Sequence, residues 1–228
     1  PDSRGIDVAM LYRKKFFSPI SEIFIPVVWP KNIGSGSTRD ILYVKGIANK
    51  KDTLHIFVNH WPSRYSGQKE SEPKRIFVAE LVKHICDSIL NVEKDANIVI
   101  MGDLNDYPTY KSLIYGLKAQ TEYENVKHGN LYNLSYYLQE TKKLGTHKFH
   151  GQWGILDQII VSGSLLDTAN SVFTSLKDAH VYNADFLLVP DESYSGKQVF
   201  RTYLCYKYHG GYSDHLPTYI DIFRNLEK

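Results

Sequence analysis

The sequence contains few cysteines, little net charge and no long apolar run. Only Cys86 and Cys205 occur among the 228 residues, and no Cys/His cluster has the spacing of a zinc site. Two buried thiols are the favoured interpretation, with a disulfide left open. No apolar run in these 228 residues is long enough to form a helix that spans a bilayer. The net charge of +2 does not by itself indicate a nucleic-acid partner, although it allows a local basic cleft.

The apolar content suits one substantial domain over residues 1–228. The first residues, Pro1-Asp2-Ser3, include neither an initiator Met nor a signal-peptide pattern. Residues 6–12 have the pattern of a strand in the middle of a sheet, so we expect the domain to lack its N-terminal part. The compartment stays undetermined: a soluble protein is expected, with secretion or a periplasmic location as alternatives. A monomer is expected.

Short apolar runs bounded by turn-forming residues predict many strands. These runs are residues 6–12, 23–28, 41–47, 54–59, 97–101, 156–161, 186–188 and 217–222. Helical spacing of apolar residues predicts a long helix over 73–90 with Ser71 as its N-cap, and shorter helices over 110–117 and 131–142. Strands outnumber helices and follow one another in pairs. The pattern therefore favours a layered α+β fold with mostly antiparallel strands.

Two short polar motifs adjoin apolar runs and carry most of the chemical information. Gly102-Asp103-Leu104-Asn105 follows residues 97–101, and Ser213-Asp214-His215 precedes residues 216–220. Asp103 and Asn105 offer a charge and a neutral oxygen, which suits magnesium or an oriented water. Asp214 places a carboxylate beside the imidazole of His215, which can exchange a proton near neutral pH. A backbone-bonded turn and a structural histidine are the alternatives, yet together the motifs predict a metal-dependent phosphohydrolase.

Four further residues could serve the same chemistry. His60 ends the run 54–59 and could stabilise phosphoryl charge or protonate a leaving group. Asp157 lies in an apolar run, where a carboxylate is costly unless it pairs with an imidazole or a metal. Arg39 and Arg64 lie beside strand ends and could contact phosphate oxygens, the alternative being solvated surface charge.

Taken in order, these strings resemble the endonuclease/exonuclease/phosphatase superfamily, which has the deoxyribonuclease I-like fold. The strings are Arg4-Gly5-Ile6-Asp7-Val8-Ala9, Thr38-Arg39, Val58-Asn59-His60-Trp61-Pro62-Ser63-Arg64, Gly102-Asp103-Leu104-Asn105, Leu156-Asp157-Gln158 and Ser213-Asp214-His215. The resemblance implies a four-layered α/β sandwich, in which two mixed, mostly antiparallel sheets pack face to face with helices outside.

The resemblance also implies a magnesium ion, with manganese as an alternative, bound by Asp214, Asp103 and Asn105. Asp103 would orient or deprotonate the attacking water with the help of Asn105. The expected partner is a phosphate-ester substrate, with nucleic acid as one candidate. The leading function is a phosphodiesterase or nuclease. The alternatives are an inositol-phosphate-like phosphomonoesterase, a sphingomyelinase-like hydrolase, or a non-catalytic binding domain on the same scaffold.

The other residues receive roles by the same resemblance. His60 would donate to the phosphoryl group as an imidazolium, and His215 would contact the scissile phosphate or act as the general base. Asp157 would support one of the imidazoles. Arg39 and Arg64 would bind the substrate phosphate.

One departure from the family pattern generates a test. The family's early Asn and its Gln-Glu pair, whose Glu is a principal metal ligand, have no counterpart before Arg4. We therefore expect these 228 residues to bind magnesium weakly and to hydrolyse bis(4-nitrophenyl) phosphate poorly, as measured by calorimetry and absorbance. Adding the upstream segment should restore both; a fully active isolated chain would mean that another ligand has replaced the Glu.

Overall fold

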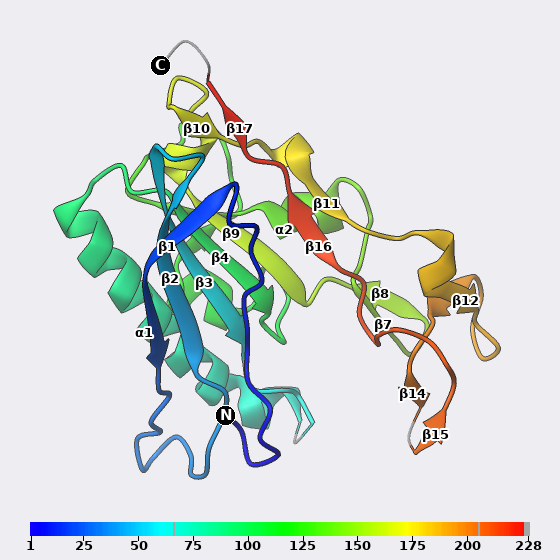
Figure 1. The fold of residues 1–228 in the computed structure, drawn as a ribbon. Coiled ribbons are helices and arrows are strands. Elements are labelled where there is room, and N and C mark those ends of the chain that lie inside the picture. Colours follow the sequence, from blue (N-terminus) through cyan, green and yellow to red (C-terminus); the bar gives the residue numbers. More distant parts are fainter. Residues whose placement is uncertain (66, 205, 226–228) are drawn as a thin grey trace.

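A mixed seven-stranded sheet forms the centre of the computed structural model, which describes residues 1–65, 67–204 and 206–225 (Figure 1). Its strands, in spatial order, are β1 (Phe17–Ile25), β2 (Ile41–Ala48), β3 (Asp52–His60), β4 (Ile98–Asp103), β9 (Asp157–Ser162), β6 (Leu131–Asn133) and β5 (Ala119–Gln120). The β3–β4 and β5–β6 pairs are parallel and the other four are antiparallel. The large central sheet with few helices agrees with the mixed, mostly antiparallel fold predicted from the sequence.

Helix α1 (Gln68–Val92) covers one face of this sheet (Figure 1). It begins at Gln68, earlier than predicted. It does not extend further back, because Gly67 has a φ of 105°, which is outside the helical range. The predicted N-cap was wrong: Ser71 lies inside the helix, and its hydroxyl donates to the carbonyl of Gly67 at 2.5 Å.

One face of α1 packs into the core. Val78, Val82 and Cys86 are fully buried, whereas Phe77 and Ile85 are only partly buried. Cys86 is a free thiol whose pKa is raised by burial. The expectation for Cys205 concerns a residue outside the described part of the chain.

A second apolar core lies on the other face of the sheet, under α2 (Leu134–Glu140). Short strand pairs complete this side: β10 (Val172–Phe173) with β17 (Phe223–Arg224), β11 (Ala179–Val181) with β16 (Thr218–Ile220), β7 (His147–Phe149) with β8 (Gln152–Gly154), β12 (Leu188–Pro190) with β13 (Lys197–Val199), and β14 (Tyr203–Leu204) with β15 (Lys207–Tyr208). Among the described residues these strands form separate two-stranded pairs, so the second sheet predicted from the sequence stays a prediction. The four-layered arrangement stays a prediction.

Two predicted strands are wrong, and one predicted helix is of another kind. Residues 6–12 join no strand ladder in the described structure, although Val8 and Met10 pack against the second core. Asp185–Leu187 forms a 3-10 turn before β12. Ser112–Gly116 forms a π-helical turn. Apolar, β-branched runs of this length do not reveal whether a neighbouring strand is available.

Two further 3-10 turns are Gly163–Leu166 and Leu176–Asp178.

No helix in the described ranges has both the length and the apolar character needed to cross a bilayer.

The register of three neighbouring strands brings polar residues to one edge of the sheet. His60 at the end of β3 is opposite Asp103 at the end of β4, and Asp103 is opposite Asp157 at the start of β9. Residues directly opposite each other in a ladder lie about 5 Å apart, so their side chains share one small region.

The close approach of β3 and β4 depends on Gly102, which has a φ of 129°. A Cβ atom at this position would lie 1.9 Å from the backbone oxygen of Asn59, so no larger residue fits without separating the strands.

Gly102→Ala should therefore lower the free energy of unfolding by about 3 kcal/mol or more, because backbone strain and a steric clash add together. Urea denaturation measures this loss. Gly36→Ala is the matched control: Gly36 has a φ of 82° and open space around its Cβ position, so it should lose only about 1–2 kcal/mol. Equal losses in the two variants would contradict the steric explanation.

Candidate active site

A polar pocket of about 700 Å³ opens where β3 and β4 end and β9 begins. It is lined by seven of the residues predicted from the sequence, namely Arg39, His60, Asp103, Asn105, Asp157, Asp214 and His215. Arg64 does not line it.

The histidines and carboxylates of the pocket form a connected chain. His60 Nε2 lies 3.4 Å from Asp103 Oδ2. His215 Nδ1 lies 2.6 Å from Asp157 Oδ2 and 4.0 Å from Asp103 Oδ2. The short Asp157 contact holds the His215 ring in one orientation and leaves its Nε2 available to another group. His60, Asp103 and His215 thus meet at one point, although they are far apart in sequence.

Burial and neighbouring charges shift the ionisation of these groups. Burial and the carboxylate of Asp157 raise the pKa of Asp103 to about 6. Burial lowers the pKa of His215. Its hydrogen bond to Asp157 and the charges of Asp157 and Asp103 raise this pKa by more than burial lowers it, so the net shift is upward.

His60 differs from the expected imidazolium. Burial, together with the positive charges of Arg39 and His215, lowers the pKa of His60 to about 4. At neutral pH in the free protein its imidazole is therefore neutral, and it can donate only one N–H to a bound phosphate.

The pocket has the donor set of a divalent-cation site. Ligand atoms of Asp103, Asp157 and His215 all lie within 4.8 Å of one another. The 2.6 Å bond between Asp157 and His215 already occupies two of these atoms, so Asp103 offers the free carboxylate. Asn105 and the exposed Asp214 line the same pocket and add the oxygen atoms that a hard cation prefers. The residues present therefore fit such an ion.

A buried network behind the pocket was not predicted from the sequence. Arg75 of α1 forms an ion pair with Asp106 at 2.8 Å, and both side chains have no exposed surface. The hydroxyl of Ser112 donates to Asp106 Oδ2 at 2.6 Å, and Gln158 Nε2 donates to the backbone oxygen of Asp106 at 2.5 Å. The only sequence signal was an Asp next to Asn105. The network holds the loop that carries Asn105.

Arg64 belongs to this loop support. Its Nε donates to the backbone oxygen of Asn105 at 2.7 Å, and its guanidinium lies 4.6 Å from the ring centre of Tyr107. Asn105 has a φ of 52°, and its side-chain amide donates to the carbonyl of Trp61 at 3.0 Å. The placement of Arg64 therefore favours positioning of Asn105 over the predicted phosphate contact, whereas Arg39 faces the pocket.

His147 is a second residue that the sequence did not indicate. Its ring centre lies 4.7 Å from that of His215. Burial and the charges of His215 and Arg201 lower the pKa of His147 to about 4. A neutral His147 therefore lies against His215 on the side of β7.

Comparison with known proteins identifies the family. Residues 1–224 match the Endonuclease/Exonuclease/phosphatase family, and the chain belongs to it. Members of this family are phosphoric ester hydrolases. No curated protein matches the sequence.

Solved structures resemble the fold at low sequence identity. A humanized D. rerio TDP2 with 14 mutations is 16% identical with a TM-score of 0.55, covering 92% of this chain and 69% of that one. The human Nocturnin catalytic domain is 14% identical with a TM-score of 0.52, covering 93% of this chain. The mannosyl-6-phosphatase Bt3783 of Bacteroides thetaiotaomicron VPI-5482 is 15% identical with a TM-score of 0.50, covering 93% and 69%. The chain spans 62% of the Nocturnin domain.

Asp103→Asn should stabilise the metal-free protein at pH 7. The pKa of Asp103 is raised from 3.8 to about 6 on folding, so the carboxyl contributes stability below about pH 4 that is lost as pH rises through 6. The variant should gain about 1–3 kcal/mol at pH 7 and nothing at pH 3, as measured by urea unfolding in chelator. An equal effect at both pH values would contradict the shift.

Asp106→Asn should destabilise the protein by about 3–5 kcal/mol, because it leaves the buried guanidinium of Arg75 without a counter-charge. Lys111→Ala is the control, since it breaks an exposed ion pair with Glu72 and should cost less than about 1 kcal/mol. Thermal or urea unfolding of both variants measures the difference. Similar costs would show that the Arg75 pair does not support the loop.

Proposed function

We propose that this chain is the catalytic part of a metal-dependent phosphoric ester hydrolase, a phosphodiesterase or nuclease that uses in-line attack by water. The observation that supports it most directly is the single pocket shared by Asp103, His60 and the Asp157–His215 pair. Membership of the Endonuclease/Exonuclease/phosphatase family supports the same reaction class.

The pocket residues divide the reaction among them. Asp103 orients the attacking water and accepts its proton. His215, held by Asp157, donates through Nε2 to a non-bridging phosphate oxygen. His60 donates a second hydrogen bond to the developing phosphoryl charge. Arg39 adds a fixed positive charge beside the substrate phosphate.

Asp103, Asn105 and Asp214 are the proposed ligands of a magnesium ion, with manganese as the alternative. When bound, the ion would screen phosphate charge and stabilise the leaving oxygen. The side chains then have only to position water and phosphate in line, which is where most of the catalytic effect in such reactions originates.

Exposed aromatic residues favour a nucleic-acid diester over a small phosphomonoester. Tyr203, Tyr208 and Tyr212 are exposed on the segment that leads into Ser213. The rings of Tyr203 and Tyr208 lie 5.4 Å apart, and Tyr212 lies 5.4 Å from Phe186. Exposed aromatic faces bind single-stranded nucleic acid by stacking on its bases. A D. rerio TDP2 structure with a TM-score of 0.54 is a complex with a single-strand DNA product.

The test compares three substrates in the protein at its natural length. Bis(4-nitrophenyl) phosphate and a single-stranded oligonucleotide should be hydrolysed with magnesium and not with chelator, and 4-nitrophenyl phosphate should be at least tenfold slower. Tyr212→Ala should raise KM for the oligonucleotide alone, by about tenfold, through lost stacking. Faster turnover of the monoester would favour a phosphatase, and no chelator-sensitive turnover of any substrate would favour a binding domain.

A further inference from the structure

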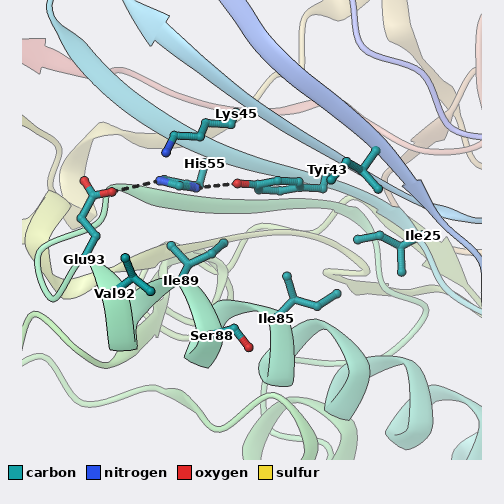
Figure 2. Close-up of a pocket in the computed structure, with 10 residues that line it drawn as sticks. Ile25, Tyr43, Lys45, His55, Ile85, Ser88, Ile89, Val92 and Glu93 are labelled. Atoms are coloured by element: carbon teal, nitrogen blue, oxygen red, sulfur yellow. Dashed lines mark hydrogen bonds and ion pairs between the residues drawn. The ribbon is translucent and has the colours of Figure 1, made fainter.

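A second pocket lies between the sheet and the C-terminal half of α1 (Figure 2). Its volume of about 470 Å³ lies within the range of small-molecule sites. It is separate from the active-site pocket: His55 in the middle of β3 lines this pocket, whereas His60 at the end of β3 lines the other. None of the residues assigned to phosphate hydrolysis contributes to it.

Most of the pocket wall is apolar. Ile25 from β1 faces Ile85, Ile89 and Val92 from α1, and these side chains surround the space in Figure 2. Such a lining favours an apolar ligand, because each buried methylene group contributes about 0.8 kcal/mol.

One end of the pocket is polar and contains a buried imidazole nitrogen, His55 Nε2, whose one acidic neighbour is too distant for a good hydrogen bond. Tyr43 Oη lies 2.8 Å from His55 Nδ1, and Glu93 Oε2 lies 3.5 Å from His55 Nε2 (Figure 2). The His55 side chain is only 3% exposed, and its Nε2 makes no hydrogen bond.

The surroundings determine which ring nitrogen carries the proton. Burial lowers the pKa of His55 despite the opposing charge of Glu93, so the ring is neutral and has one N–H. A carboxylate can only accept, so the proton lies on Nε2, towards Glu93, and Nδ1 accepts from the hydroxyl of Tyr43. The Glu93 carboxylate lies 3.5 Å away, so this buried N–H is only weakly satisfied, and a ligand oxygen at normal hydrogen-bond distance would satisfy it better.

We propose that this pocket binds a molecule with an apolar chain that ends in a hydrogen-bond-accepting oxygen. The chain lies among the isoleucines, and the terminal oxygen accepts from His55 Nε2. Glu93, whose side chain is 45% exposed, turns outward to make room. Lys45 lies at the same end of the pocket (Figure 2), so the oxygen can belong to a neutral alcohol or to a carboxylate.

The test titrates 1-octanol, octanoate and octylammonium into the ¹⁵N-labelled chain and follows the amide signals of the pocket residues. The two oxygen-terminated probes should bind saturably with a Kd of about 1 mM or tighter. Octylammonium offers only donors, so its Kd should be at least tenfold higher. If only one oxygen-terminated probe satisfies both conditions, it identifies the chemical source of the oxygen.

Two helix variants give the matched comparison. Ser88→Trp fills the pocket from an exposed position that lines it, and should weaken binding at least tenfold. His84→Trp adds the same side chain at an exposed position of α1 outside the pocket and should leave binding unchanged.

A third variant, His55→Phe, replaces the imidazole by an aromatic ring without a donor, and should also weaken binding at least tenfold. Three results would overturn the proposal: octylammonium binding as tightly as octanol and octanoate, Ser88→Trp and His84→Trp behaving alike, or no saturable shift at the pocket residues. Hydrolysis plays no part in these measurements, so they are independent of the proposed enzymatic activity.

Discussion

The backbone ladder that holds β4 between β3 and β9 is the constraint on which the candidate active site depends. Parallel pairing on one side and antiparallel pairing on the other bring His60, Asp103 and Asp157 into one row. A shift of either register by one residue would turn Asp103 or Asp157 to the opposite face of the sheet. The backbone hydrogen bonds of the sheet therefore determine which side chains share the pocket, independently of the contacts between those side chains.

The carboxylates in this row are costly to the fold. Asp103 and Asp157 are neighbours with limited access to water, and the pKa of Asp103 is raised as a result. A folded protein tolerates such repulsion when the remaining structure is stable enough, and sites that bind cations are where it is expected. The buried pair of Arg75 and Asp106, by contrast, brings opposite charges together, so neither charge is left uncompensated.

Much of the fold could be predicted from local pattern, and so could the family. Runs such as 41–47 and 54–59 were predicted correctly, and they form β2 and β3, which pair with each other, because short apolar runs bounded by turn-forming residues are typical of strands. The motifs around Asp103 and His215 were recognisable because their residue types are costly to bury without a purpose. The strand predicted over residues 6–12 was wrong, because strand pairing depends on a neighbouring strand that the local sequence does not encode.

The support of the site was beyond local reasoning. Arg75 belongs to no motif in the sequence, and only the path of the helix places it against Asp106. Arg64 was predicted to contact phosphate because it lies beside a strand end. In the structure its Nε donates to the backbone oxygen of Asn105, and its guanidinium lies over the ring of Tyr107. The neutral state of His60 likewise depends on burial and on cations brought together from three distant segments.

Gly102 has a consequence for comparing distant relatives. Related structures share only about one residue in seven with this chain, 14% in the case of Nocturnin, so most alignment columns carry little information. In this chain the backbone oxygen of Asn59 leaves no room for a side chain at position 102, and this constraint comes from the spacing of β3 and β4 and not from the reaction. That position therefore offers an anchor from which two otherwise unalignable sequences can be brought into correspondence.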